Sequence, residues 1–187
     1  EQSAVQNRKR SKLPKDLPNS ENLTYDNVDF TSQSLTKQLI DAGFDQTKSS
    51  IFTLEGVSQY ISKEAVSSTI KEIAILTQKA TSIFFISYVH ELLNKNPNAC
   101  FGKGYLKAEK CAKLIQDLSA KAGEPWISFY SNEEIKSLFS QNGYFLKENM
   151  TVEDLNTAYF APVGRILPEN QMLKLEHFVV AQAHPKS

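Results

Sequence analysis

The chain has 187 residues, of which 41% are hydrophobic and 22% are charged. These values are typical of a soluble globular domain, and the length suffices for one domain with a sizeable core. The 21 basic and 21 acidic residues cancel to a formal net charge of zero. Because neither sign dominates and no apolar run has the length of a membrane helix, we expect neither nucleic acid nor a membrane as a partner.

The first half of the chain alternates between strand-like and helix-like segments. Residues 23–30 predict a short strand, and residues 31–42 predict a helix. The next strand is expected at 51–54, and Ser62 is a suitable N-cap for the helix that follows it. A near-continuous apolar run at 83–89 predicts a strand that is covered on both faces.

The second half begins with a region rich in Asn, Pro and Gly at 94–105, which predicts a loop. Residues 106–121 predict a helix that turns Leu114, Ile115 and Leu118 inward. The sequence Ser-Asn-Glu-Glu at 131–134 is a capping box and starts another helix. The last two strands are expected from residue 144 onward and at 177–183, paired as an antiparallel, hairpin-like edge.

This order of elements is typical of an α/β fold. Strands and helices alternate first, then a helical insert occupies about residues 90–130, and a helix and two strands follow. Such alternation predicts a mostly parallel sheet with helices on both faces. The strand predicted at 51–54 ends in Glu55 and Gly56, and ligands bind beyond the carboxyl ends of strands in such sheets. Glu55 is therefore a candidate ligand-binding carboxylate, although a solvated turn residue would leave the same pattern.

Five short segments carry a further signal through their order and spacing. They are Val-Asp-Phe at 28–30 with Ala-Gly-Phe-Asp at 42–45, Leu-Glu-Gly-Val-Ser-Gln-Tyr-Ile-Ser at 54–62, Ser-Ile-Phe-Phe-Ile-Ser-Tyr-Val at 82–89, Gly-Glu-Pro-Trp at 123–126 and Gly-Tyr-Phe at 143–145. Together they resemble the S-adenosylmethionine-dependent methyltransferases related to leucine carboxyl methyltransferase and the tetracenomycin-type O-methyltransferases. The resemblance runs from near residue 1 to about residue 181. It implies a Rossmann-like class I methyltransferase sheet whose last strand is inserted antiparallel.

The resemblance also implies a glycine-rich turn after the first strand of the sheet. The chain has no Gly-x-Gly motif before its first predicted strand. We therefore expect residues 1–187 to form the C-terminal two-thirds of a single methyltransferase domain, with the N-terminal strands absent from this chain and a helical substrate region at about 90–130. On this interpretation the chain alone binds the cofactor poorly.

The cofactor that the resemblance implies is S-adenosyl-L-methionine. By position, Asp29 lies near the adenine, Glu55 lies near the methionine part, and Glu1 stands where an acid holds the ribose. Asp29 could instead cap a helix. The complete set implied for cofactor binding is Glu1, Asp29, Phe30, Leu54, Glu55 and Gly56.

The methyl acceptor is expected to be a carboxylate or hydroxyl oxygen of a small molecule or of a protein C-terminus. A hydroxyl acceptor needs a general base, for which His90 is a candidate, whereas a carboxylate acceptor needs none but benefits from a cationic clamp such as Arg165. Tyr60 could face the acceptor or pack under its loop, and His90 and Arg165 could equally have only structural roles. Trp126 could line the pocket or belong to the core. No catalytic residue is identified by the sequence alone.

Cys100 and Cys111 have no metal-ligand spacing to other Cys or His residues, so we expect free thiols, a reducing and hence cytoplasmic location, and no metal. Two rival functions remain open. One is a truncated or degenerate non-catalytic relative that acts as an interaction module. The other is a different nucleotide-binding α/β enzyme such as a dehydrogenase, which would need a phosphate-binding turn that is equally absent.

Overall fold

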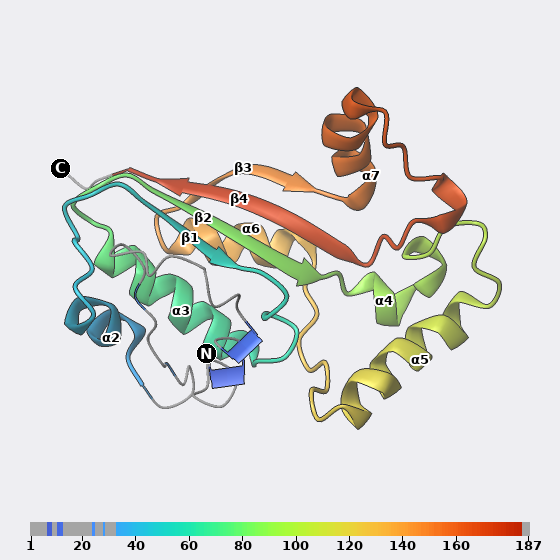
Figure 1. The fold of residues 1–187 in the computed structure, drawn as a ribbon, viewed down its shortest axis with the longest axis horizontal. Coiled ribbons are helices and arrows are strands. Elements are labelled where there is room, and N and C mark those ends of the chain that lie inside the picture. Colours follow the sequence, from blue (N-terminus) through green and yellow to red (C-terminus); the bar gives the residue numbers. More distant parts are fainter. Residues whose placement is uncertain (1–6, 9–10, 13–23, 25–27, 29–32, 185–187) are drawn as a thin grey trace.

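The computed structural model describes residues 7–8, 11–12, 24, 28 and 33–184. Within them, four strands form one sheet in the order β1-β2-β4-β3 (Figure 1). Their bounds are Ser50–Leu54 for β1, Ser82–Val89 for β2, Phe145–Met150 for β3 and Glu176–Ala183 for β4. The strands expected at 51–54, 83–89 and 177–183 are confirmed, whereas the strand expected at 23–30 falls mostly outside the described residues.

The direction of the strands confirms the predicted fold class. β1 and β2 run parallel, and β4 runs antiparallel to both β2 and β3. β1, β2 and β3 therefore point the same way, and the last strand alone opposes them. The expected antiparallel edge formed by the final two strands is confirmed, with β3 outermost and β4, the last strand, inserted antiparallel between β2 and β3. The interior place of β4 fits its apolar core face, where Val179 and Ala181 are fully buried.

The helices occupy the connections between the strands. The α-helices are α2 (Leu35–Asp41), α3 (Lys63–Leu76), α4 (Leu92–Lys95), α5 (Ala108–Lys121), α6 (Asn132–Gln141) and α7 (Val152–Leu155). Shorter turns are η1 (Pro97–Ala99), η2 (Asn156–Phe160), η3 (Ala161–Val163) and η4 (Glu169–Gln171). The predicted loop at 94–105 therefore contains the end of α4 and all of η1, and α7 with the turns after it was not predicted.

Local sequence sets where these helices begin. The hydroxyl of Ser62 accepts a hydrogen bond from the backbone N–H of Ala65 at the start of α3, as expected of an N-cap. At the start of α6, Ser131 and Glu134 form the predicted capping box, in which each side chain accepts a backbone N–H of the other residue, at 3.1 and 2.8 Å.

The main core lies between one face of the sheet and helices α3 and α6. β2 turns alternate side chains, including Phe84 and Ile86, to this face, where they meet Ile70 of α3 and Phe139 of α6. The rings of Phe84 and Phe139 make an edge-on contact with a centroid distance of 5.5 Å. Because aromatic side chains bury large apolar areas, this contact is a central part of the packing between sheet and helices.

The opposite face of the sheet does not carry the cover that the sequence predicted. Ile51 is 71% exposed there, and Phe85 and Phe178, which stack at 6.4 Å, are only half-buried. Within residues 33–184, α3 and α6 pack on the core face, whereas α4 and α5 meet the opposite face only at Val89, at the end of β2. The expectation of helices on both faces is therefore met only in part by the described residues. An apolar run shows that both faces of a strand can be buried. It does not show which segments cover those faces.

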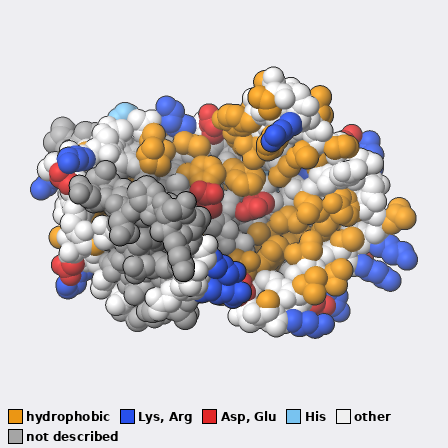
Figure 2. Space-filling model, in the orientation of Figure 1, with side chains coloured by type: hydrophobic (Ala, Val, Ile, Leu, Met, Phe, Trp, Pro, Cys, Tyr) orange, Lys and Arg blue, Asp and Glu red, His pale blue; other side chains and the backbone are white. Residues whose placement is uncertain are grey.

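A second, smaller core lies beyond the carboxyl end of β2, where α4 and α5 pack together. The predicted inward face of α5 is partly wrong: Ile115 packs against this core, but Leu114 and Leu118 are exposed. The helix instead docks through the small residues Ala108 and Ala112, which allow close approach and rotate the leucines outward. Figure 2 shows hydrophobic side chains gathered on the surface in the region of α4 and α5.

Within the described residues, no helix combines the length and the apolar character needed to cross a membrane.

We expect Phe139→Ala to lower the free energy of unfolding by about 3–5 kcal/mol, because it removes a fully buried ring and leaves a cavity under the sheet. Denaturant titration of the purified chain measures this change. Leu106→Ala is the matched control, since Leu106 is 83% exposed and should change stability by less than about 0.5 kcal/mol. Equal losses in the two variants would contradict the packing described for α6.

Candidate functional site

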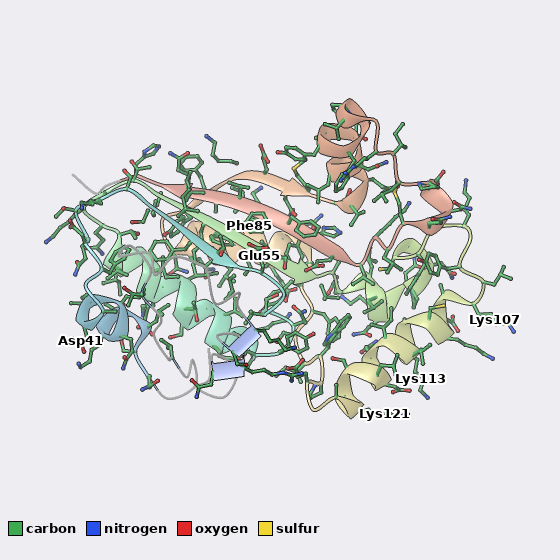
Figure 3. The ribbon with its side chains drawn as sticks, in the orientation of Figure 1. Asp41, Glu55, Phe85, Lys107, Lys113 and Lys121 are labelled. Carbon is green, nitrogen blue, oxygen red and sulfur yellow. The ribbon has the colours of Figure 1, made fainter. Side chains whose placement is uncertain are left out.

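The turn after β1 is held against the end of β2. Glu55 follows the last residue of β1 directly, and its side chain is exposed at the carboxyl edge of the sheet (Figure 3). Gly56 adopts a positive φ of 63°, and its N–H donates to the hydroxyl of Ser87 at 2.9 Å. The hydroxyl of Ser58 donates to the carbonyl of Ser87 at 2.8 Å. Two hydrogen bonds to one residue of β2 therefore fix the turn that presents Glu55.

The loop continues onto the segment before α6. The carbonyl of Gln59 accepts hydrogen bonds from the backbone N–H groups of Ile127 and Ser128, at 2.7 and 3.2 Å. The rings of Tyr60 and Trp126 meet edge-on at 6.5 Å, and both residues are half-buried. This contact gives Tyr60 and Trp126 a packing role, and it joins the segment Gly-Glu-Pro-Trp to the turn that carries Glu55.

His90, which follows β2, is buried and has a defined tautomer. Its Nδ1 accepts the backbone N–H of Leu92 at 3.1 Å, so the proton of the neutral ring resides on Nε2. Burial lowers the pKa of His90. The nearby carboxylate of Glu91 partly opposes this shift, and the charge of Lys95 adds to it. The neutral ring therefore offers a donor at Nε2, and the role of His90 as a general base stays a prediction.

A polar cluster surrounds His90 on the core face of the sheet. The ring of His177, on β4, lies 4.6 Å from the ring of His90. The hydroxyl of Tyr88 donates to Oδ1 of Asn132 at 2.7 Å and lies 3.4 Å from Nδ1 of His177. Asn149 of β3 completes the cluster with a contact of 3.1 Å from Nδ2 to the same hydroxyl. Four elements thus contribute to one network at the carboxyl edge.

Burial governs the protonation of this cluster. It raises the pKa of Tyr88 to about 12, so the hydroxyl stays protonated. It lowers the pKa of His177 to about 4, with the neighbouring His90 acting in the same direction and Asp154 partly opposing it. Both histidines are therefore neutral near pH 7. No local pattern in the sequence groups His177, Asn132 and Asn149, because their proximity depends on the place of β4 between β2 and β3.

Arg165 lies in the connection between η3 and β4, and its side chain is exposed. The backbone N–H of Arg165 donates to the carbonyl of Phe160 at 2.9 Å. Asn156 anchors the same loop, since its side chain accepts the N–H of Leu167 at 2.8 Å and donates to the carbonyl of that residue at 3.3 Å. Within the described residues, no contact joins Arg165 to Glu55 or His90, so its role as a substrate clamp stays a prediction.

Other sequence candidates lie outside the described residues, namely Glu1, Asp29 and Phe30. In the part that the structure describes, no group of three or more His, Cys, Asp or Glu side chains is arranged to hold a metal ion. Cys100 and Cys111 are free thiols, and burial raises the pKa of Cys100 to about 11.

Comparison with known proteins tests the family suggested by the sequence. Residues 1–74 match the model of the family named leucine carboxyl methyltransferase. Over 134 residues, 72% of this chain, the sequence is 29% identical to the Bacillus subtilis (strain 168) protein YktD, whose name provisionally describes it as an S-adenosyl-L-methionine-dependent methyltransferase. Both matches agree with the resemblance to leucine carboxyl methyltransferases, and the family model covers the first 74 residues of this chain. The chain spans 40% of the length of YktD.

Solved structures share the fold of this chain. A DUF574 family protein from Streptomyces avermitilis MA-4680 has a TM-score of 0.56 at 13% identity, covering 85% of this chain and 54% of that one. A SAM-dependent methyltransferase from Anabaena variabilis ATCC 29413 has a TM-score of 0.51 at 12% identity, covering 88% and 60%. At these low identities the likeness shows only the fold, a Rossmann-like sheet. The chemistry has to be argued from the residues of this chain.

The buried His177 predicts a dependence of stability on pH. The unfolded chain binds a proton at His177 with a pKa of about 6.5, whereas the folded chain binds it with a pKa of about 4. Between these values the unfolded state holds more protons, so stability is complete above about pH 6.5 and falls as the pH falls to about 4. We expect this residue to account for about 2–3 kcal/mol of that loss.

Denaturant titrations at several pH values measure this effect. His177→Gln should flatten the decline between pH 7 and pH 4 by that amount, whatever its effect on stability at pH 7. His184→Gln is the control, because His184 is exposed and should leave the decline unchanged. A decline that is identical in wild type and His177→Gln would contradict the buried, neutral state of His177.

Proposed function

We propose that this chain forms part of an S-adenosylmethionine-dependent O-methyltransferase and carries the methionine side of its cofactor site. The observation that carries the proposal is the turn Glu55–Gly56 at the carboxyl end of β1, tied to Ser87 of β2 and contained in the segment that matches the family. Ligands of α/β sheets bind at this edge. S-adenosylmethionine carries an ammonium and a sulfonium charge, which an exposed carboxylate there can stabilise.

The proposed cofactor contacts divide by element. Glu55 would accept a charge-assisted hydrogen bond from the methionine part, and Leu54 and Gly56 would offer backbone groups beside it. Asp29 and Phe30 would hold the adenine, and the acidic residue Glu1 would hold the ribose. All these residues lie within the 74 residues matched by the family, which supports treating them as one site.

For the acceptor we propose a carboxylate oxygen in preference to a hydroxyl. Methyl transfer to a carboxylate needs no general base, whereas transfer to a hydroxyl does. The hydrogen bond from Leu92 to Nδ1 of His90 leaves Nε2 as a donor, which suits an anionic oxygen that must be held in line with the methyl group. Arg165, on the loop after η3, would add a cationic clamp, and Tyr60 would pack against the acceptor or beneath it.

We prefer an enzyme to a non-catalytic relative as the function of this chain. The reason is that specific hydrogen bonds hold the turn at Glu55, as expected of a retained binding site. A cytoplasmic place of action fits the two free thiols, Cys100 and Cys111. The acceptor would be a small molecule or a peptide carboxylate.

Cofactor binding is tested by calorimetry of the complete protein with S-adenosylmethionine. Glu55→Gln should weaken binding by about 1–3 kcal/mol, because it removes the charge from a charge-assisted hydrogen bond while keeping the size of the side chain. Glu133→Gln, an exposed carboxylate in the first turn of α6, is the control and should bind as wild type does. Unchanged affinity in Glu55→Gln would assign Glu55 to the structure of its own turn.

The acceptor class is tested by the stability of the product. The complete protein is incubated with a small-molecule extract and S-adenosylmethionine labelled in its methyl group. Methyl esters release labelled methanol in mild alkali, whereas methyl ethers do not. We expect alkali-labile label that requires the protein, and alkali-stable label would favour a hydroxyl acceptor and overturn the donor role of His90.

A further inference from the structure

Two imidazole rings lie together at the carboxyl edge of the sheet, and each turns one nitrogen to the protein. The ring of His90, after β2, lies 4.6 Å from the ring of His177, on β4, with 32° between the two planes. Nδ1 of His90 accepts the backbone N–H of Leu92, and Nδ1 of His177 lies 3.4 Å from the hydroxyl of Tyr88. Among the described residues, neither Nε2 atom has a hydrogen-bond partner. Each ring therefore has one nitrogen that remains to meet another molecule.

The hydrogen bonds of Tyr88 set the tautomer of His177. The hydroxyl of Tyr88 donates its proton to Oδ1 of Asn132 at 2.7 Å, and it accepts a hydrogen bond from Nδ2 of Asn149 at 3.1 Å. A tyrosine hydroxyl has only one proton to donate, but its oxygen can accept. The contact with Nδ1 of His177 is therefore favourable when Nδ1 carries the proton of the neutral ring. This arrangement leaves Nε2 of His177 as an acceptor.

The two rings thus present opposite groups, an N–H at Nε2 of His90 and a lone pair at Nε2 of His177. Asp154 acts on His177 through its charge, but its Oδ2 already accepts the backbone N–H and the hydroxyl of Thr151, at 2.8 and 2.7 Å. The exposed fractions of the histidines, 8% and 9%, leave them less enclosed than Tyr88, which is 0% exposed. A donor and an acceptor on neighbouring rings match a ligand that offers an acceptor and a donor on neighbouring atoms.

We propose that His177 selects the methyl acceptor, because its Nε2 accepts a hydrogen bond from an O–H or N–H on the carbon beside the carboxylate. The inference rests on the function proposed above, in which Nε2–H of His90 holds a carboxylate oxygen. Hydrogen bonds of about 2.9 Å from such a ligand to each ring can bridge the separation of 4.6 Å between the rings. The substrate class is thus an α-hydroxy acid or an α-amido acid, and the second includes the carboxyl end of a peptide.

The tautomers are tested without any ligand. Nitrogen-15 NMR of the imidazole rings distinguishes a protonated ring nitrogen from an unprotonated one. In the full chain at pH 7 we expect a protonated Nε2 in His90 and a protonated Nδ1 in His177. A protonated Nε2 in both rings, or a charged ring at His177, would overturn the proposal, because no acceptor would remain at His177.

Binding of matched acids to the complete protein tests the selection itself, with S-adenosylhomocysteine, which has no methyl group to transfer, added to fill the cofactor site. Lactate offers an O–H beside its carboxylate and N-acetylalanine offers an N–H, whereas propanoate and 2-methoxypropanoate offer neither. The ring signals of His90 report binding. We expect lactate or N-acetylalanine to bind about three- to tenfold more tightly than the two acids without a donor, the effect of one hydrogen bond.

The outcomes separate the two proposals. Tighter binding of lactate would indicate a hydroxy acid as the substrate, and tighter binding of N-acetylalanine would indicate a peptide end or another α-amido acid. Equal Kd values for all four acids would overturn the selection by His177 and leave the role of His90 intact. A failure of every acid to shift the signals of His90 would overturn both.

A matched pair of variants separates selection from packing. His177→Phe keeps a ring beside His90 but has no acceptor, so the preference for acids with a donor should vanish even if every Kd changes. His184→Phe is the control and should keep the preference, because His184 is exposed and follows the opposite end of β4. A preference that survives in His177→Phe, or that both variants lose equally, would show that His177 has only a packing role.

Discussion

The antiparallel insertion of β4 between β2 and β3 is the constraint on which the rest of the structure depends. β4 pairs with β2 along eight residues of each strand, from Ser82 with Ala183 to Val89 with Glu176. This register places His177 beside Tyr88 and puts Val179 and Ala181 into the main core. Both edges of β4 are therefore paired, and the register fixes which side chains meet at the carboxyl edge.

The carboxyl edge has two different surfaces because of this arrangement. Glu55 is exposed on a turn held by Ser87, whereas His90 and His177 are buried on the core face. In the proposed function the exposed carboxylate would meet a charged cofactor, and the buried imidazole would orient an oxygen of the acceptor. The network of Tyr88, Asn132 and Asn149 supports this surface, since a satisfied buried polar network holds its members in one arrangement.

Tyr130 joins the segment before α6 to the end of β2. Its ring lies edge-on to Tyr88 with a centroid distance of 6.1 Å. The backbone of Tyr130 makes two hydrogen bonds at the end of β2. Its N–H donates to the carbonyl of Val89, and its carbonyl accepts the N–H of Glu91. The segment before α6 therefore supports the end of β2 that carries His90.

The sequence by itself determined the α/β class, the three strands at 50–54, 82–89 and 176–183, and the capping of α3 and α6, and it displayed the resemblance to a methyltransferase family. These features depend on local periodicity and on short-range hydrogen bonds, as at Ser62 and Ser131, which a sequence displays directly. It also placed Glu55 at the end of a strand. The resemblance implied an antiparallel last strand inserted into the sheet, and the structure gives its neighbours as β2 and β3. Only the tertiary structure decided the register of that strand, the docking of α5 through its alanines, and the neighbours of His90, His177 and Tyr130. Those outcomes depend on strand order, helix rotation and burial, which are set by contacts between segments far apart in the chain.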